Sequence, residues 1–413
     1  MKTLIEAPFL VAGDEMELLR GGYILIDNNI ISEVGTGEPP SAERRIRHEQ
    51  SIAIPGLINA HTHIGDSALK DAGFGRSLNE LFKPPDGLKH RLLRDTGKDV
   101  ILRAVKDTLT KMLTSGTTTF VDFREGSVDG ARILFTALWE QSIRALIFGR
   151  PDYTFDTEQL SNNRGAIPAD SLVALHELLS TTHGLAPSSP NDITDEALQQ
   201  LAEIAKEHRK LRATHAAENP ESERVSKSRT GLTEVERAVE YFDVDLLVHL
   251  IYASQRDLDL VAERDIPVAV CPRANASLGL RLPPIPEMLD RGITVCLGTD
   301  NVMLNQPDMF REMEFTLKAY RIEKTATRHL SPKEILKMAT INGARALKID
   351  DETGSIKEGK SADLTVIDLN RNLKNTKDLL AALTHRAGAE DVSSVLIGGK
   401  IVFDMGKSSR GNC

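Results

Sequence analysis

The sequence holds too few cysteines for a disulfide framework, with only Cys271, Cys296 and Cys413 among its 413 residues. Cys271 and Cys296 end or lie within β-branched runs, so we expect both to be buried, reduced thiols. No apolar run approaches the ~20 residues that a membrane-spanning helix needs. Glu6 and Pro8 interrupt the apolar part of the N-terminal stretch, which argues against a signal peptide. These absences predict a cytoplasmic protein.

Positive charge is also scarce, because 51 lysine and arginine residues stand against 60 aspartate and glutamate residues and the net charge is -9 at pH 7. Nucleic acids and anionic membrane surfaces are bound through clustered Lys and Arg. The balance argues against a general surface for either and leaves a small molecule as the expected partner. The other proportions, 40% hydrophobic and 27% charged, are those of an ordinary globular protein.

Short strands with turns occupy both ends of the sequence. In GGYILIDNNIISEVG two apolar runs flank Asp27–Asn29, and in VSSVLIGGKIVFDMG two more flank Gly398–Gly399, both of which are hairpin signals. Neither end has enough strands to be stable alone. We therefore expect residues 1–54 and 350–413 to pair as one composite β-sandwich domain.

Between these ends, over residues 55–349, short β-rich runs alternate with helical patterns. The runs are GLINAHTH, GTTTFVDF, RALIFGRPD, HGLAPSS, RATHAAEN, DLLVHLIYAS, IPVAVCPRAN and ITVCLGTDN. This alternation predicts right-handed βαβ units and a parallel sheet. Eight strands within about the 250 residues typical of the fold match an α/β structure of the TIM-like (β/α)8 barrel type. No glycine-rich fingerprint follows an early strand, which disfavours a dinucleotide-binding fold.

Three local details of the helical patterns can also be predicted. Thr194 is a candidate N-cap, and Ser331 with Glu334 forms a capping box around a proline in the first turn. Trp139 lies in the helical run ARILFTALWEQS and is expected to pack in the core.

Two histidines one residue apart, His61 and His63, end the first β-rich run. Residues i and i+2 of a strand face the same side, here at the C-terminal end of the first barrel strand, where barrel active sites lie. Two imidazole nitrogens on one face can bind one metal ion at about 2.0–2.1 Å. The pair alone is weak evidence, because histidine often fills the polar end of a strand.

Other strand ends supply the same kinds of ligand. His215 ends the fifth strand with Glu218 on the turn just beyond it, His249 lies in the sixth strand, and Asp300 ends the eighth. One such residue is ordinary, but this many at the ends of separate strands is not expected by chance. The combination predicts a metal site at the mouth of the barrel.

The motifs PGLINAHTH, THAAEN, VHL, CPRANASLG, LGTDN and NGARALKI…TGSIKEGKSADLTVID resemble those of the metal-dependent amidohydrolase superfamily, in its cytosine-deaminase and chlorohydrolase-like branch. The likeness covers nearly the whole chain, and the motifs follow the order of the family. It implies a metal-dependent barrel with a split β-domain, assembled as a dimer or a higher homo-oligomer. By this resemblance Glu218 and His249 act on substrate and nucleophile. The implied metal ligands are His61, His63, His215 and Asp300.

The chemistry of these residues agrees with the resemblance. Three imidazoles and a carboxylate leave a divalent ion room for water, whose pKa the ion lowers towards ~7, and the hydroxide can attack an sp² carbon that bears an amino group. Glu218 is placed to carry a proton from that water to the ring nitrogen. Asp300 can pass the second proton to the leaving ammonia, while His249 orients the hydroxide and stabilises the developing charge.

We therefore expect a hydrolytic deaminase of an amino-substituted nitrogen heterocycle, such as a nucleobase or nucleoside, or of a related amidine. One alternative is a cyclic amidohydrolase that opens an imidazolone- or hydantoin-like ring with the same nucleophile. Another is a catalytically inactive barrel kept as an assembly module, which the presence of every expected ligand type disfavours.

The number of metal ions follows from the fourth strand. Two-metal members of the superfamily usually bridge the ions with a carboxylated Lys or a Glu there, but this strand ends GLAPSSPND with neither at its tip. We predict one divalent ion per chain. Zn²⁺ is favoured by a His-rich, redox-silent site, and Fe²⁺ is the alternative.

The substrate pocket departs from the better-known branch members. Ser188 stands where many nucleoside deaminases have His, Asn275 follows Ala rather than Ser, and residues 64–95 replace a Trp-containing segment. We expect residues 64–95 to select the substrate. Several cations near the mouth would suit an anionic substituent if they converge, although a solvated or helix-covering role fits each of them as well. The candidate substrate contacts are Lys89, His90, Arg124, Arg150, Ser188, Arg273 and Asn275.

Overall fold

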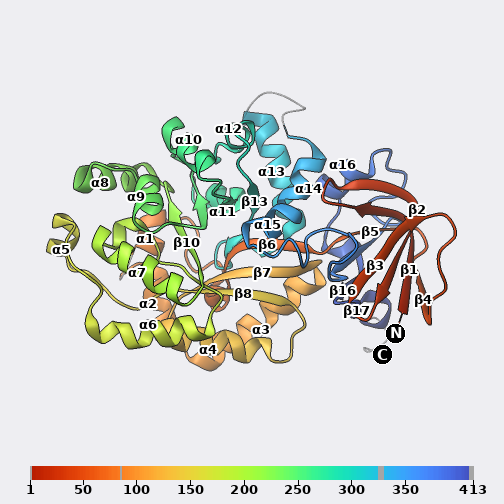
Figure 1. The fold of residues 1–413 in the computed structure, drawn as a ribbon, viewed down its shortest axis with the longest axis horizontal. Helices are drawn as coiled ribbons and strands as arrows, with labels where there is room; N and C mark the ends of the chain where they lie inside the picture. The colour runs from red at the N-terminus through yellow and green to blue at the C-terminus, as the bar shows by residue number, and fades with distance from the viewer. Residues whose placement is uncertain (1, 84–85, 324–329, 409–413) are drawn as a thin grey trace.

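The computed structural model describes residues 2–83, 86–323 and 330–408, which form two β-sheets and a set of helices (Figure 1). The strands from the two ends of the chain, red and blue in Figure 1, lie together at one end of the molecule. The strands and helices of the middle segment make up the rest. In the described residues no helix is long and apolar enough to cross a membrane.

The end sheet has eight strands drawn from both ends of the chain. They are β1 (Lys2–Ala12), β2 (Glu17–Asp27), β3 (Ile30–Thr36), β4 (Arg44–Arg47), β5 (Ser51–Pro55), β15 (Leu364–Asp368), β16 (Val392–Ile397) and β17 (Lys400–Asp404). Their order is β17-β16-β15-β5-β1-β2-β3, with β4 also paired to β1. Both predicted hairpins are present, β2 with β3 and β16 with β17. Ile5, Ile24 and Leu364 belong to a small core within this sheet, so the two chain ends form one β-structure, as predicted.

The second sheet is parallel and curls into the barrel. Its strands are β6 (Leu57–His63), β7 (Thr117–Arg124), β8 (Arg144–Gly149), β9 (Gly184–Leu185), β10 (Leu211–Ala216), β11 (Leu246–His249), β12 (Val268–Val270), β13 (Val295–Leu297) and β14 (Asp300–Asn301). Their order is β13-β12-β11-β10-β9-β8-β7-β6-β14. The sequence order of the strands is thus also their order in space, as repeated βα units require.

The strands β13 and β14 are one barrel strand interrupted at Gly298 and Thr299. β13 pairs with β12, whereas β14 pairs with β6. Between them the amide of Gly298 donates to the carbonyl of Val270 (2.9 Å), and the amide of Thr299 donates to the carbonyl of His61 (3.0 Å). The interrupted eighth strand therefore joins the first strand to the seventh and closes the predicted (β/α)8 barrel.

Helices connect the barrel strands and cover the sheet. Those before β10 are α1 (Leu78–Phe82), α2 (Leu88–Asp95), α3 (Lys98–Thr114), α4 (Ser127–Leu138), α5 (Thr157–Asn162), α6 (Ala169–Thr181) and α7 (Asp195–Glu207). Those from β10 to β14 are α8 (Pro220–Thr230), α9 (Glu234–Glu240), α10 (Gln255–Glu263), α11 (Pro272–Ser277) and α12 (Ile285–Asp290). After β14 come α13 (Met309–Glu323), α14 (Pro332–Met338), α15 (Ile341–Ala346), α16 (Leu379–His385) and α17 (Met405–Ser408). Short 3₁₀ turns lie at Ile64–Leu69, Pro190–Asp192 and Ala389–Asp391.

The predicted helix starts are confirmed, but the prediction for the tryptophan is wrong. The Thr194 side chain accepts a hydrogen bond from the amide of Ala197, and the capping box at Ser331 is formed. Trp139 is 89% exposed. The buried face of α4 runs through Leu134 and Ala137, and Trp139 falls off that face at the end of the helix.

The predicted state of two cysteines is also confirmed. Cys271 and Cys296 are buried and unpaired, and Cys413 lies outside the described residues. Their burial raises the pKa of both thiols, so they are inert apolar groups of the core rather than nucleophiles.

The division into two domains stays a proposal. The boundary between residues 54 and 55 falls at the last residue of β5, and Gly56 leads directly into β6. The main hydrophobic core continues from the barrel to Val392 and Val395 of the end sheet. The two parts therefore share a core as well as a chain connection.

Gly298→Ala should destabilise the protein by about 1–3 kcal/mol, because the seam of the barrel leaves no room for a methyl group. A Cβ at position 298 would lie 2.7 Å from Cβ of His61 and 2.9 Å from its backbone nitrogen and oxygen. Thermal unfolding measures the effect. Gly97→Ala is the control, since a Cβ there meets nothing within 4 Å. Equal unfolding temperatures for parent and Gly298→Ala would contradict the packing argument.

Candidate active site

A cavity of about 470 Å³ opens at the C-terminal ends of the barrel strands. Its size falls within the ~300–1,000 Å³ usual for small-molecule sites. The loops and strand ends of the barrel supply its walls. The predicted metal-binding and catalytic residues among its lining are His63, His215, Glu218, His249 and Asp300.

Three imidazole nitrogens and one carboxylate oxygen converge beside this cavity. Nε2 of His61 lies 3.4 Å from Nε2 of His215 and 3.4 Å from Oδ1 of Asp300. Nε2 of His63 lies 3.3 Å and 3.6 Å from the same two atoms. Ligand atoms bound about 2.0–2.1 Å from a tetrahedral metal lie ~3.4 Å from one another. These four separations match that value, and the ligand atoms of His61, His63 and His215 all lie within 4.8 Å of one another, as do those of His61, His249 and Asp300.

The surroundings give three of these donors, His61, His215 and Asp300, the charge state that a metal site needs. Burial lowers the pKa of His61 to about 4 and the pKa of His215 well below its usual range, so both are neutral at pH 7. Burial opposes ionisation of Asp300, but the hydrogen bond with His61 and the charges of the surrounding histidines together outweigh it and keep the pKa of this carboxyl below its ordinary value. Neutral imidazoles and an ionised carboxylate are the donor set that zinc and similar ions accept.

The remote nitrogens of two of these histidines are held by the surrounding chain. Nδ1 of His215 donates to the carbonyl of Ser188 (2.6 Å). Nδ1 of His63 lies 3.0 Å from the carbonyl oxygen of Phe123 and 3.0 Å from Oε1 of Glu125. A proton on Nδ1 leaves the lone pair of Nε2 for a metal. Nδ1 of His61 is buried and finds no hydrogen-bond partner among the described residues.

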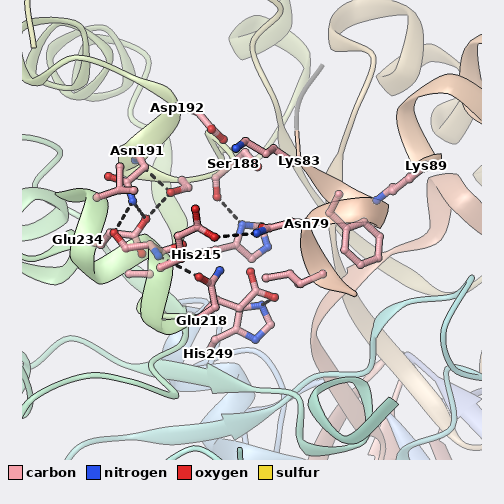
Figure 2. A pocket seen from close by; sticks show the side chains of 18 of the residues that line it. Asn79, Lys83, Lys89, Ser188, Asn191, Asp192, His215, Glu218, Glu234 and His249 are labelled. Carbon is pink, nitrogen blue, oxygen red and sulfur yellow. Dashed lines mark hydrogen bonds and ion pairs between the residues drawn. The ribbon is translucent and has the colours of Figure 1, made fainter. Parts of the chain in front are cut away.

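Glu218 and His249 line the same cavity as His63, His215 and Asp300, and Figure 2 shows both of them near His215. Nε2 of His249 is 3.5 Å from Oε1 of Glu218. Burial, with the charges of Asp300 and Glu234, raises the pKa of Glu218 well above its usual value, and burial lowers the pKa of His249 to about 3. A carboxyl group with a raised pKa and a neutral imidazole therefore face the same space.

The turn that carries Glu218 is fixed by a buried carboxylate, Glu234, at the start of α9. Its Oε2 accepts a hydrogen bond from the amide of Ala217 (2.9 Å), and its Oε1 accepts from Ser189 (2.5 Å) and from Asn191 (2.8 Å). The last of these bonds is visible in Figure 2. Ala217 has a φ of 50°, a region that non-glycine residues rarely adopt. Glu234 therefore stabilises a strained turn that aims Glu218 at the site.

Four of the predicted substrate residues, Lys89, His90, Arg150 and Ser188, line the cavity. The segment 64–95, predicted to select the substrate, supplies part of the same wall through α1 and α2. Its lining residues are Leu78, Asn79, Phe82, Lys83, Lys89 and His90. Pro84 and Pro85 of this segment lie outside the described residues.

The other three predicted substrate residues are not part of the cavity lining. Nε of Arg124 donates to the carbonyl of Gly130 (2.8 Å), and Arg273 donates to the carbonyl of Gln306 (3.1 Å). Asn275 is fully buried in α11, and its amide has no hydrogen-bond partner among residues 2–83, 86–323 and 330–408. The structure therefore places these three side chains outside the cavity.

Glu125, Asp66 and Glu234 are polar residues at or beside the site that were not predicted from the sequence. Glu125 directly follows β7, so the rule that located His215 and Asp300 at strand ends would also have located it. Alternation along β7 turns Arg124 away from the cavity and brings the next residue towards it. Glu234 begins a helix and gives no local signal of a role at the site.

Comparison with known proteins places the chain in a family. The model of the amidohydrolase family matches residues 52–402. A putative aminohydrolase of Methanothermobacter thermautotrophicus is 36% identical over 97% of this chain and 98% of its own length. A 5-methylthioadenosine/S-adenosylhomocysteine deaminase of Thermoanaerobacter pseudethanolicus is 31% identical over 95% of this chain and 91% of its own.

A solved structure shows the same fold. The atrazine chlorohydrolase of Arthrobacter aurescens, crystallised with zinc, superposes with a TM-score of 0.84 at 23% identity, over 97% of this chain and 95% of that one. The resemblance found in the sequence motifs is thereby confirmed at the level of the family and the fold. The chain belongs to the amidohydrolase family and is an enzyme of that family.

Proposed function

We propose that the protein is a metal-dependent hydrolytic deaminase that releases ammonia from an amino-substituted nitrogen heterocycle, nucleobase- or nucleoside-like, or from a related amidine. The observation that carries the proposal is the convergence of four metal-donor atoms beside the raised-pKa carboxyl of Glu218. The names of relatives such as the deaminase of T. pseudethanolicus support the same reaction class.

One divalent ion, zinc in preference to iron, would be held by His61, His63, His215 and Asp300. The zinc in the crystal of the atrazine chlorohydrolase supports this choice of metal. A single ion is proposed because the tip of β9 leads into Ala-Pro-Ser-Ser, without a Lys or Glu to bridge two ions. When bound, such an ion supplies a water molecule activated as a nucleophile at neutral pH.

Glu218 is proposed as the group that moves protons. Its carboxyl accepts the proton of the attacking water and delivers it to the ring nitrogen next to the reacting carbon, which makes that carbon more electrophilic. A general acid–base group works best when its pKa is close to the working pH, and burial shifts Glu218 in that direction. The turn held by Glu234 keeps this carboxyl aimed at the cavity.

Asp300 and His249 are proposed to complete the reaction. Asp300 accepts the second proton and passes it to the leaving amino group, which departs as ammonia. His249, neutral and 3.5 Å from Glu218, orients the attacking oxygen and donates to the charge that develops on the tetrahedral centre. A donor fixed in place before the reaction costs no reorganisation at the transition state.

The cavity beyond these residues supports a substrate with polar substituents. Arg150 lines it, and none of the described residues forms a hydrogen bond or ion pair with its guanidinium group. Its charge acts on the buried carboxyl of Asp192, which lines the same cavity, and a guanidinium with no hydrogen-bond partner there favours a planar anion such as a carboxylate or phosphate. Ser188 occupies the position where many nucleoside deaminases have His, so the part of the substrate beyond the ring is expected to differ from theirs.

An ammonia-release screen tests the proposal directly. Purified, zinc-loaded protein is incubated with purines, pyrimidines, pterins and their phosphates, while ammonia and the ultraviolet spectrum are followed. We expect ammonia release with a spectral change that keeps the ring intact, and a preference for charged analogues that Arg150→Ala removes. Ring opening without ammonia would assign the protein to the cyclic amidohydrolases instead. No turnover of any compound by fully loaded protein would contradict the proposal.

Assembly as a dimer or higher homo-oligomer and a cytoplasmic location are further proposals. The first rests on the resemblance to the family, and the second on the absence of an apolar run long enough for a membrane helix. The mass of the protein in solution and cell fractionation test them.

A further inference from the structure

A chain of buried charged side chains lies next to the proposed metal site and has no part in the proposed reaction. It consists of Asp66, Lys89 and Glu125. The Lys89 ammonium forms an ion pair with Oε1 of Glu125 and lies 3.6 Å from Oδ2 of Asp66. The three side chains are 0%, 3% and 12% exposed, respectively, so nearly all of their charge has been removed from water.

This series of three charged side chains contacts a different barrel strand at each end, and each of the two strands carries at least one proposed metal ligand. At one end Oε1 of Glu125 lies 3.0 Å from Nδ1 of His63 at the end of β6. At the other end Asp66 accepts hydrogen bonds from Nδ2 of Asn301 (2.8 Å), in β14, and from the amide of Met303 (3.1 Å). The three charged side chains therefore bridge the seam at which the first and eighth barrel strands meet.

A contribution to the stability of the fold does not by itself explain why three charged side chains are buried together here. Replacing a buried ion pair by apolar side chains of similar volume is often neutral or stabilising, because desolvation offsets the attraction between the charges. The histidine at one end of this series, however, must keep a proton on Nδ1 if Nε2 is to bind a metal. Two acceptors lie 3.0 Å from that nitrogen, the carbonyl oxygen of Phe123 and Oε1 of Glu125, and of the two the carboxylate is the stronger acceptor.

We infer that Glu125 and Lys89 are positioning residues of the metal site. Glu125 accepts the Nδ1 proton of His63 and thereby orients the ring and strengthens Nε2 as a ligand. Lys89 holds the carboxylate of Glu125 in place, and Asp66 ties Lys89 to the strand of Asp300. This inference rests on the proposed metal-binding role of His63.

The surroundings of Lys89 separate it from a substrate-binding role. Its ammonium is already paired and nearly buried, and it lies 5.7 Å from the centre of the Phe82 ring. Figure 2 shows Lys89 at the far side of the view from Glu234 and Asn191. Although its side chain forms part of the cavity wall, the charged group is directed to Glu125 rather than left free for a ligand.

The test is the zinc affinity of the protein without substrate, measured by competition with a chelator. Glu125→Gln should weaken zinc binding by about 10- to 100-fold, the effect usual for a group that supports a metal-bound histidine. Lys89→Met should weaken it similarly in the parent and have no further effect in the Glu125→Gln background. Lys89→Arg, which keeps the ion pair, should restore most of the affinity. In the cobalt-loaded protein Glu125→Gln should also shift the visible absorption bands.

Matched controls come from an exposed pair with the same chemistry, Lys106 and Glu140, whose charged atoms are 3.2 Å apart. Glu140→Gln and Lys106→Met should leave zinc affinity unchanged. The inference is overturned if Glu125→Gln binds zinc like the parent, or if Lys89→Met costs the same factor with and without Glu125. It is also overturned if Lys89→Met raises KM while zinc affinity is unchanged, since Lys89 would then contact substrate. Failure of the parent protein to bind zinc would instead count against the proposed function.

Discussion

Replacement of Glu218 by glutamine should lower kcat by about 10²- to 10⁴-fold while the protein keeps its metal. Glutamine has almost the same shape as glutamate, but its amide can neither accept the proton of the attacking water nor deliver it to the ring. None of the four converging donor atoms belongs to Glu218, so the metal site itself is not changed. Steady-state kinetics combined with elemental analysis of the same sample measures both parts of the prediction.

A comparison with Glu177→Gln separates this effect from a general response to the loss of a carboxylate. Glu177 lies on α6 and pairs with Arg132, and its side chain is 48% exposed. This variant should retain the parental kcat. If Glu218→Gln also turned over substrate at a near-parental rate with metal bound, another group would have to move the protons.

Removal of the metal should abolish turnover, and one equivalent of zinc per chain should restore it. The proposed reaction takes its nucleophile from water on the metal that His61, His63, His215 and Asp300 would hold. Zinc that binds the folded state but not the unfolded state also raises the free energy of unfolding. The increase is about 4 kcal/mol when the free zinc concentration is 1,000 times the dissociation constant. The apoprotein should therefore unfold at a lower temperature than the loaded protein.

Elemental analysis during reconstitution decides the stoichiometry. Activity should rise in proportion to zinc and reach its plateau at one ion per chain. A plateau at two ions, or full activity in protein shown to be free of metal, would contradict the single-ion site. Reconstitution with Fe²⁺ under anaerobic conditions compares the second candidate metal on the same scale.

The barrel and the place of its polar strand ends could be predicted because both follow from local periodicity. Alternating β and helical runs determine the order of the strands, and the C-terminal ends of parallel strands meet at one mouth. His61, His215 and Asp300 could therefore be assigned to the same rim although more than 200 residues separate the first from the last. The side chains then converge because the sheet closes, not because of any nearby sequence signal.

The supporting groups could not be found in the same way. Whether Arg124 or Glu125 faces the cavity depends on where β7 ends, and a shift of one residue exchanges the two sides of a strand. Lys89 reaches the site from a helix, and Glu234 reaches it from the start of another, so their contacts are tertiary and leave no periodic pattern. The prediction that Trp139 is buried fails for a related reason, since a helical pattern in the sequence does not show at which residue the buried face of the helix ends.

The seam at Gly298 has a consequence for the order in which the protein assembles. The Nδ2 of Asn59 in β6 donates to the hydroxyl of Thr299 across a sequence separation of 240 residues, so closing this junction costs a large loop-closure entropy and we expect it to form late. Asp300, beside that junction, cannot join the histidines of the first strand before the ring has closed. An ion that needs all four donors would therefore bind and stabilise the barrel only after it has closed, and would not nucleate its folding.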